Sequence, residues 1–222
     1  YNAASKIALA GLIPMGLISA SFYPVLSKFF KESKEKFQKA WDYQLEIMIL
    51  SALPLVVGGI VLAPRIIYYF YSFDFAPSVL VFQILITTAG LIFLSRPFSD
   101  AMIICNQQKA MFWITLSGAL VNIILNLILI PRYSLYGAAW ATVVAYVLVL
   151  LTYFKYTMKL TPIHPLNFKM FFAFISAMFS SFFMYLAITQ PFIYNLNIFL
   201  SILVGVSIYL ISLSIFRKII KC

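Results

Sequence analysis

The feature that most constrains this chain is a series of long apolar stretches that contain no Asp, Glu, Lys or Arg. Each of the first five has roughly the 20 residues that an α-helix needs to cross a bilayer. They are Ile7–Ser27, Ile47–Pro64, Phe75–Ser95, Ala110–Pro131 and Tyr133–Phe154. The last stretch, Met170–Phe216, is about twice as long. Gln190-Pro191, Asn195 and Asn197 interrupt it, so we expect two helices joined by a turn there.

These stretches predict an all-α, polytopic membrane protein: a bundle of about seven transmembrane helices in a single domain, residues 1–222. The expected spans are about 3–27, 47–64, 77–104, 110–131, 134–154, 170–189 and 196–216. A soluble domain is excluded because its surface cannot accommodate a composition that is 64% hydrophobic and 10% charged. The net charge of +10 does not indicate nucleic acid, since the basic residues lie mostly between apolar stretches, where anionic membrane lipids are the better partner.

The basic residues also predict the orientation, because cytoplasmic loops carry an excess of Lys and Arg. If the segment after the first span is cytoplasmic, twelve basic residues lie inside and two, Arg65 and Arg132, lie outside. The twelve are Lys28, Lys31, Lys34, Lys36, Lys39, Lys109, Lys155, Lys159, Lys169, Arg217, Lys218 and Lys221. We therefore expect a cytoplasmic C-terminus in a cell (inner) membrane, with Tyr1 near the outer face. Because an apolar helix is already under way at Tyr1, we also expect a C-terminal part of a longer protein.

The segment between the first two spans, Lys28–Glu46, has a pattern of its own. It mixes Lys with acidic residues and carries Phe30, Phe37 and Trp41 at near-helical spacing. This pattern predicts an amphipathic helix on the inner membrane surface. A solvated connector is the alternative.

Three charged residues, Lys6, Arg96 and Asp100, are expected within spans, where a charge is costly and usually faces a cavity or a partner. Arg96 and Asp100 are four residues apart, which places them on one helix face. In one interpretation these two pair with each other, while Lys6 extends to the outer interface. In the other, Lys6 and Arg96 make a water-filled cavity positive and bind an anionic headgroup.

Asp100 has a second possible role. It is the only acidic residue well inside a span, so it is the carboxylate of this chain that could couple transport to a proton or Na⁺. Pairing with Arg96 is the simpler interpretation.

Neither the neutral polar residues nor the motifs of the sequence indicate that the protein catalyses a reaction. Asn122 and Asn126 lie four residues apart in the fourth span, and we expect them to hydrogen-bond neighbouring helices. The sequence contains no Ser/His/Asp set, metal-ligating cluster or phosphate-binding glycine loop. It therefore predicts no catalytic residues, no cofactor and no metal site.

Several motifs resemble a known family. These are Tyr1-Asn-Ala-Ala-Ser-Lys-Ile, Ile13-Pro14, Ala20-Ser-Phe-Tyr-Pro24-Val-Leu-Ser27, Asn122-Ile-Ile-Leu-Asn126-Leu-Ile-Leu-Ile-Pro131 and Tyr136-Gly137-Ala-Ala-Trp-Ala141-Thr142. Over most of residues 1–158 the chain resembles the second half of polysaccharide flippases of the O-antigen type. Their superfamily includes the MATE exporters and the lipid II flippase.

The resemblance implies one lobe of a two-lobe transporter with alternating access. The substrate would be a polyprenyl-diphosphate-linked oligosaccharide repeat unit, moved from the inner to the outer leaflet for polysaccharide or lipopolysaccharide synthesis. The missing N-terminal lobe would be the partner of this chain. Lys6, inside the Ala-Ala-Ser-Lys motif, and Arg96 would suit a cavity that receives the diphosphate.

Other functions remain open at this stage. A multidrug or cation exporter of the same superfamily would need acidic residues in its cavity, and this chain offers Asp100 against Lys6 and Arg96. A membrane polymerase of the polysaccharide pathway would be expected to have large polar outer loops, and the outer loops here are short. A structural membrane subunit is a further alternative.

Overall fold

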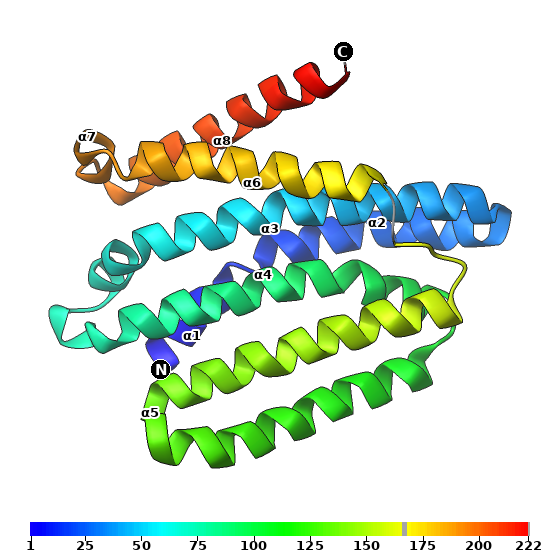
Figure 1. Cartoon of the computed structure of the whole chain (residues 1–222), viewed down its shortest axis with the longest axis horizontal. Helices are drawn as coiled ribbons and strands as arrows, with labels where there is room; N and C mark the ends of the chain where they lie inside the picture. The colour runs from blue at the N-terminus through cyan, green and yellow to red at the C-terminus, as the bar shows by residue number, and fades with distance from the viewer. Residues whose placement is uncertain (166–167, 222) are drawn as a thin grey trace.

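The computed structural model describes residues 1–165 and 168–221, with backbone alone for 219–221, so the side chain of Lys221 lies outside the described part. The described residues form helices and no strand, which confirms the all-α fold class (Figure 1). In chain order the elements are α1 (Asn2–Ala10), α2 (Ile13–Glu32), α3 (Lys34–Phe70), the 3-10 turn η1 (Phe73–Phe75), α4 (Pro77–Ile104), α5 (Gln108–Leu160), α6 (Phe168–Ile188), α7 (Pro191–Tyr194) and α8 (Ile198–Lys221).

Six helical stretches in the described part are long and apolar enough to cross a membrane. The first combines α1 and α2, which are separated by a break at Gly11 and Leu12. Pro14 lies at the start of α2, where the N–H that proline lacks would be without a helical partner anyway. The proline thus starts a new helix and explains the break.

The longest stretch, α5, doubles back at Ser134, whose φ of 51° and ψ of −130° are not helical. Figure 1 shows the two arms of α5, residues 108–133 and 135–160, running side by side in opposite directions. With this reversal the six stretches contain seven helical segments, each long enough to cross a membrane. The sequence placed the turn at Arg132, two residues before the observed reversal.

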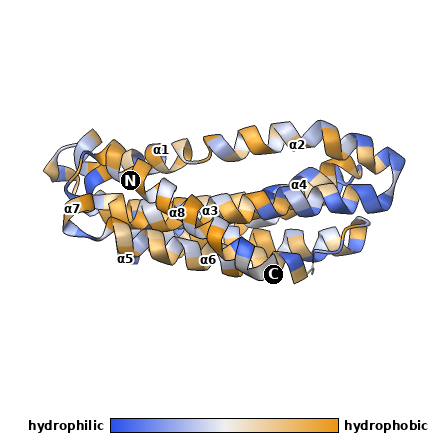
Figure 2. Cartoon of the chain, turned by 90° about the horizontal axis from the view of Figure 1, so that it is seen from above, coloured by the Kyte–Doolittle hydropathy of each residue, from blue (hydrophilic) through white to orange (hydrophobic). Residues whose placement is uncertain are grey.

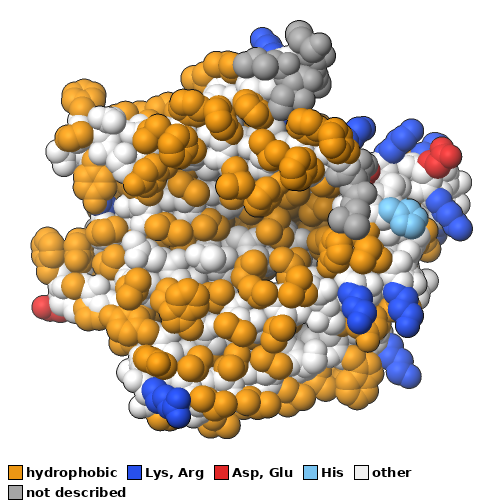
Figure 3. Space-filling view, in the orientation of Figure 1, with side chains coloured by type: hydrophobic (Ala, Val, Ile, Leu, Met, Phe, Trp, Pro, Cys, Tyr) orange, Lys and Arg blue, Asp and Glu red, His pale blue; other side chains and the backbone are white. Residues whose placement is uncertain are grey.

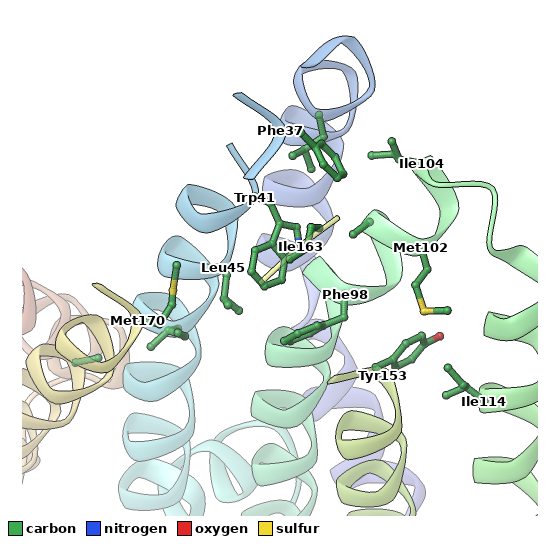
Figure 4. Packing of buried hydrophobic residues seen from close by; sticks show 14 residues of the cluster. Phe37, Trp41, Leu45, Phe98, Met102, Ile104, Ile114, Tyr153, Ile163 and Met170 are labelled. Atoms are coloured by element: carbon green, nitrogen blue, oxygen red, sulfur yellow. The ribbon is translucent and has the colours of Figure 1, made fainter. Parts of the chain in front are cut away.

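The predicted surface helix between the first two spans is wrong. Instead, α2 and α3 both continue to a one-residue break at Ser33, which has extended backbone angles. Phe37 and Trp41 are fully buried, and the Trp41 ring packs edge-to-face on Phe98 of α4 at 5.3 Å (Figure 4). The apolar face of this segment therefore meets α4 and not lipid. The solvated connector is also excluded for these residues.

Helix α4 lies at the centre of the bundle. It is the most buried of the candidate spans and is apolar on all sides, as a surrounded helix must be. It covers residues 77–104, the same range as the expected third span. Figure 2 shows α1 and α2 along one side of the bundle, away from α5 and α6.

The last two long helices, α6 and α8, pack on each other and on α3. Three polar contacts connect α8 with α3. Arg65 donates to the Ser201 hydroxyl at 2.8 Å, and the Tyr209 hydroxyl donates to the carbonyl of Leu50 at 2.7 Å. The third contact is the ion pair between Arg217 and Glu46.

Charged side chains follow the ends of the bundle. In Figure 3 the Lys and Arg side chains gather mainly at one end, and the middle of this face is covered by apolar side chains. An apolar middle with charged side chains toward the end is the distribution expected of a protein that crosses a bilayer, whose interfaces accommodate the charges. The structure is therefore that of a multi-pass membrane protein.

Candidate functional site

A cavity of about 500 Å³ lies between α4 and the two arms of α5. Its wall combines one arginine with neutral polar and small side chains. The lining residues are Met15 of α2, Ile92, Ser95, Arg96 and Ser99 of α4, Thr115, Gly118, Ala119 and Asn122 of the first arm of α5, and Thr142, Ala145, Tyr146, Val149 and Tyr153 of the second arm. Gly118 allows the two arms of α5 to approach closely, because a Cβ atom there would lie 2.2 Å from Cγ2 of Val149. Among the described lining residues, Arg96 is the one that carries a charge.

The Arg96 side chain connects this cavity with the interior of the bundle. Its Nε atom donates to the Ser19 hydroxyl at 3.0 Å and lies 3.0 Å from Oδ1 of Asp100. The side chain is 40% exposed, and its two Nη groups make no hydrogen bond to the described residues. They are thus free to bind a ligand in the cavity.

Asp100 is completely buried beneath Arg96. Its Oδ2 atom accepts hydrogen bonds from the Ser19 hydroxyl at 2.6 Å and from Nε2 of Gln44 at 2.8 Å. Its Oδ1 atom has the ionic contact with Arg96 but accepts no hydrogen bond from the described residues. This carboxylate therefore joins α2, α3 and α4, and the prediction that Arg96 and Asp100 pair with each other is confirmed.

Sequence reasoning did not identify the neutral partners of this network, Ser19 and Gln44. Gln44 is completely buried although it belongs to the segment predicted to lie on the membrane surface. The available signal was that Gln44 follows Phe37 by seven residues and Trp41 by three, which places it on the same helical face as these two aromatic residues.

Lys6 and Arg96 do not line one common cavity in this chain. Lys6 is exposed on α1, and it lines neither the cavity above nor a smaller one of about 160 Å³ between α1, α4 and α5. The two cavities share Ile92, Thr142 and Tyr146, so they adjoin each other. The structure thus associates Arg96, but not Lys6, with the polar cavity.

Asn122 and Asn126 contact each other instead of a neighbouring helix. Nδ2 of Asn126 donates to Oδ1 of Asn122 at 2.9 Å, along the first arm of α5. No hydrogen bond to another described helix is found for either side chain, contrary to the sequence-based expectation. Asn122 lines the cavity, so its amide is placed to contact a ligand.

A second, apolar groove of about 330 Å³ lies between α6 and α8. Its lining residues are Phe179, Phe183, Ile208, Ile211, Ser212, Ile215 and Phe216. A wall of this kind offers a surface for a hydrocarbon chain, and its described lining includes no charged side chain.

The sequence matches no family model and no curated protein. The structure, however, is similar to a solved structure of the lipid II flippase MurJ in an inward closed conformation, with a TM-score of 0.78 and 22% sequence identity. The similarity covers 100% of this chain and 48% of the flippase chain, so this chain spans about half the length of that protein. At this level of identity the likeness establishes the fold. This chain therefore shares its fold with half of a solved transporter.

Proposed function

We propose that this chain is one half of a membrane transporter that flips polyprenyl-diphosphate-linked oligosaccharide repeat units from the inner to the outer leaflet by alternating access. The observation that carries the proposal is the cavity beside α4, where the free Nη groups of Arg96 face a space lined with hydroxyl and amide groups. The fold shared with a lipid II flippase supports the general class of lipid-linked substrate.

The chemistry of the cavity suits the two polar parts of such a substrate. A guanidinium group presents paired N–H donors that match the oxygen atoms of a phosphate, and the interaction strengthens where water is scarce. The hydroxyl groups of Thr115, Tyr146 and Tyr153 and the amide of Asn122 can exchange hydrogen bonds with sugar hydroxyls. The apolar groove between α6 and α8 offers a place for the prenyl chain.

A cation exporter would need a carboxylate that faces the cavity. The described wall of the cavity contains no acidic residue, because Asp100 lies buried behind Arg96. The charge of the site therefore favours an anionic substrate. It does not favour the multidrug alternative.

In this proposal the other half of the transporter covers the side of the bundle formed by α1 and α2. Only Ser19 and Leu26 of α2 are buried in this chain, so most of that helix is available for contact. Exposed Lys6 on α1 would then face the other lobe and contribute its charge to the shared cavity. The basic end of the bundle would lie on the cytoplasmic side of a cell membrane, with the C-terminus.

The proposal is tested by deleting the complete gene in its host and measuring lipid-linked repeat units on each membrane face. We expect repeat units to accumulate on the inner leaflet. The wild-type gene should restore export, whereas Arg96→Gln should not. Arg132→Gln is the matched control, because Arg132 is exposed at the α5 hairpin and lines none of the cavities described above.

Normal export after deletion, together with altered drug sensitivity, would instead identify an exporter. Full restoration by Arg96→Gln at normal expression would remove Arg96 from the substrate site.

A further inference from the structure

One guanidinium group stands between a buried carboxylate and an open cavity. Nε of Arg96 is used on the inner side, 3.0 Å from Oδ1 of Asp100 and 3.0 Å from the Ser19 hydroxyl. Its Nη groups have no hydrogen-bond partner among the described residues, and the side chain lines the cavity. The same positive charge can therefore face two anions at once, Asp100 and a ligand.

The surroundings of Asp100 contain few groups that could balance a further negative charge. Helix α2 contributes the Ser19 hydroxyl, α3 the Gln44 amide and α4 the Arg96 guanidinium, so Arg96 is the one charged partner in the described part. From α5, the hydroxyl groups of Tyr146 and Tyr153 line the cavity that Arg96 faces. The charges around Asp100 thus balance at one negative against one positive.

We infer that Asp100 takes up a proton when an anionic diphosphate diester binds to Arg96 from the cavity; this rests on the proposed function. A bound diphosphate adds two negative charges beside a single guanidinium. An uncompensated carboxylate in a buried site is unfavourable, and protonation is the ordinary way to remove its charge. A buried carboxyl proton needs an acceptor, and Oε1 of Gln44, whose Nε2 atom already donates to Asp100, is a buried acceptor without a hydrogen-bond partner in the described part.

The sign of the coupling follows from linkage. If anion binding favours protonated Asp100, then acidic conditions must favour anion binding by the same factor. The proton and the anion are bound together and are not exchanged for each other. For one linked proton, the affinity for the anion falls by up to about tenfold for each unit that the pH rises.

The test uses the complete gene product in lipid nanodiscs and a soluble nucleotide sugar as the probe, because its diphosphate diester stays ionised near neutral pH. Calorimetric titration in buffers of different ionisation enthalpy measures the protons taken up for each probe molecule bound. We expect uptake of up to one proton by the wild-type protein, and loss of this uptake in Asp100→Asn with binding retained. Glu46→Gln, an acidic residue of α3 paired with Arg217, is the matched control and should keep the uptake.

Infrared difference spectra of the wild-type protein provide a measurement that needs no variant to fold. Addition of the probe should produce the band of a protonated carboxyl group. Binding of the probe without proton uptake and without this band would overturn the inference while leaving the proposed function intact. Proton uptake that persists in Asp100→Asn would also overturn it. Absence of probe binding at every pH would overturn the inference and the proposed function together.

Discussion

The replacement Gly137→Ala tests how the α5 hairpin is built. A Cβ atom on Gly137 would lie 2.4 Å from the carbonyl oxygen of Leu129 and 2.6 Å from its carbonyl carbon, whereas ordinary contacts begin near 3.4 Å. The added Cβ atom would thus be about 1 Å too close to the carbonyl oxygen, so the two arms must separate by about this distance. Both partners are backbone atoms, so no side-chain rotation can relieve the contact.

Overpacking of this kind costs about 1–3 kcal/mol, and the rigid backbone contact places Gly137→Ala near the upper end of that range. Gly58→Ala is the matched control, because a Cβ atom on Gly58 would have as its nearest neighbour the flexible end of Met184, at an ordinary contact distance of 3.7 Å. Alanine there should be neutral or stabilise the helix by about 0.5–1 kcal/mol. Thermal denaturation of the complete protein in one detergent should show Gly137→Ala melting several degrees below the wild type and Gly58→Ala at or above it. An unchanged melting temperature for Gly137→Ala would refute the close approach of the two arms.

Two further replacements address the buried contacts around α4. Asp100→Ala should destabilise the protein by about 1–3 kcal/mol, because it leaves the buried Ser19 hydroxyl and Gln44 amide without their acceptor; an unchanged stability in denaturant titrations would contradict this role. Trp41→Phe keeps an aromatic ring but loses the 2.9 Å hydrogen bond from Nε1 to the carbonyl of Pro97. It should cost about 1 kcal/mol in the same titrations, and no loss would mean that this bond contributes nothing to the packing of α3 on α4.

Much of the fold could be predicted from the sequence because lipid imposes simple rules. Long charge-free stretches have few alternatives to helices, and α4 covers the residues expected for the third span. The same rule failed between the first two spans. Charged residues there were taken to end the helices, yet α2 and α3 continue beyond the apolar stretches to Ser33. Hydropathy indicates which residues are stable in lipid. It does not indicate where a helix ends once it has extended beyond the membrane into water.

The candidate site was predictable only where it depends on local spacing. The four-residue separation of Arg96 and Asp100 was sufficient to predict their pairing, because such neighbours meet on one helix face. Ser19 and Gln44 lie 81 and 56 residues away from Asp100 in the sequence, so only the packing of α2 and α3 on α4 brings them together. Asn122 and Asn126 illustrate the same limit, since their spacing allowed both a mutual contact and contacts with other helices.

The central proposal is that Arg96 presents its charge to the diphosphate of a lipid-linked oligosaccharide. Its most direct test is the rate at which the complete protein, purified and reconstituted in liposomes, moves such a lipid between leaflets. Removal of a charge-assisted hydrogen bond should slow transport by about tenfold or more in Arg96→Gln, while Arg132→Gln should retain the wild-type rate. Equal rates for Arg96→Gln and the wild type, at equal amounts of folded protein, would contradict the proposal.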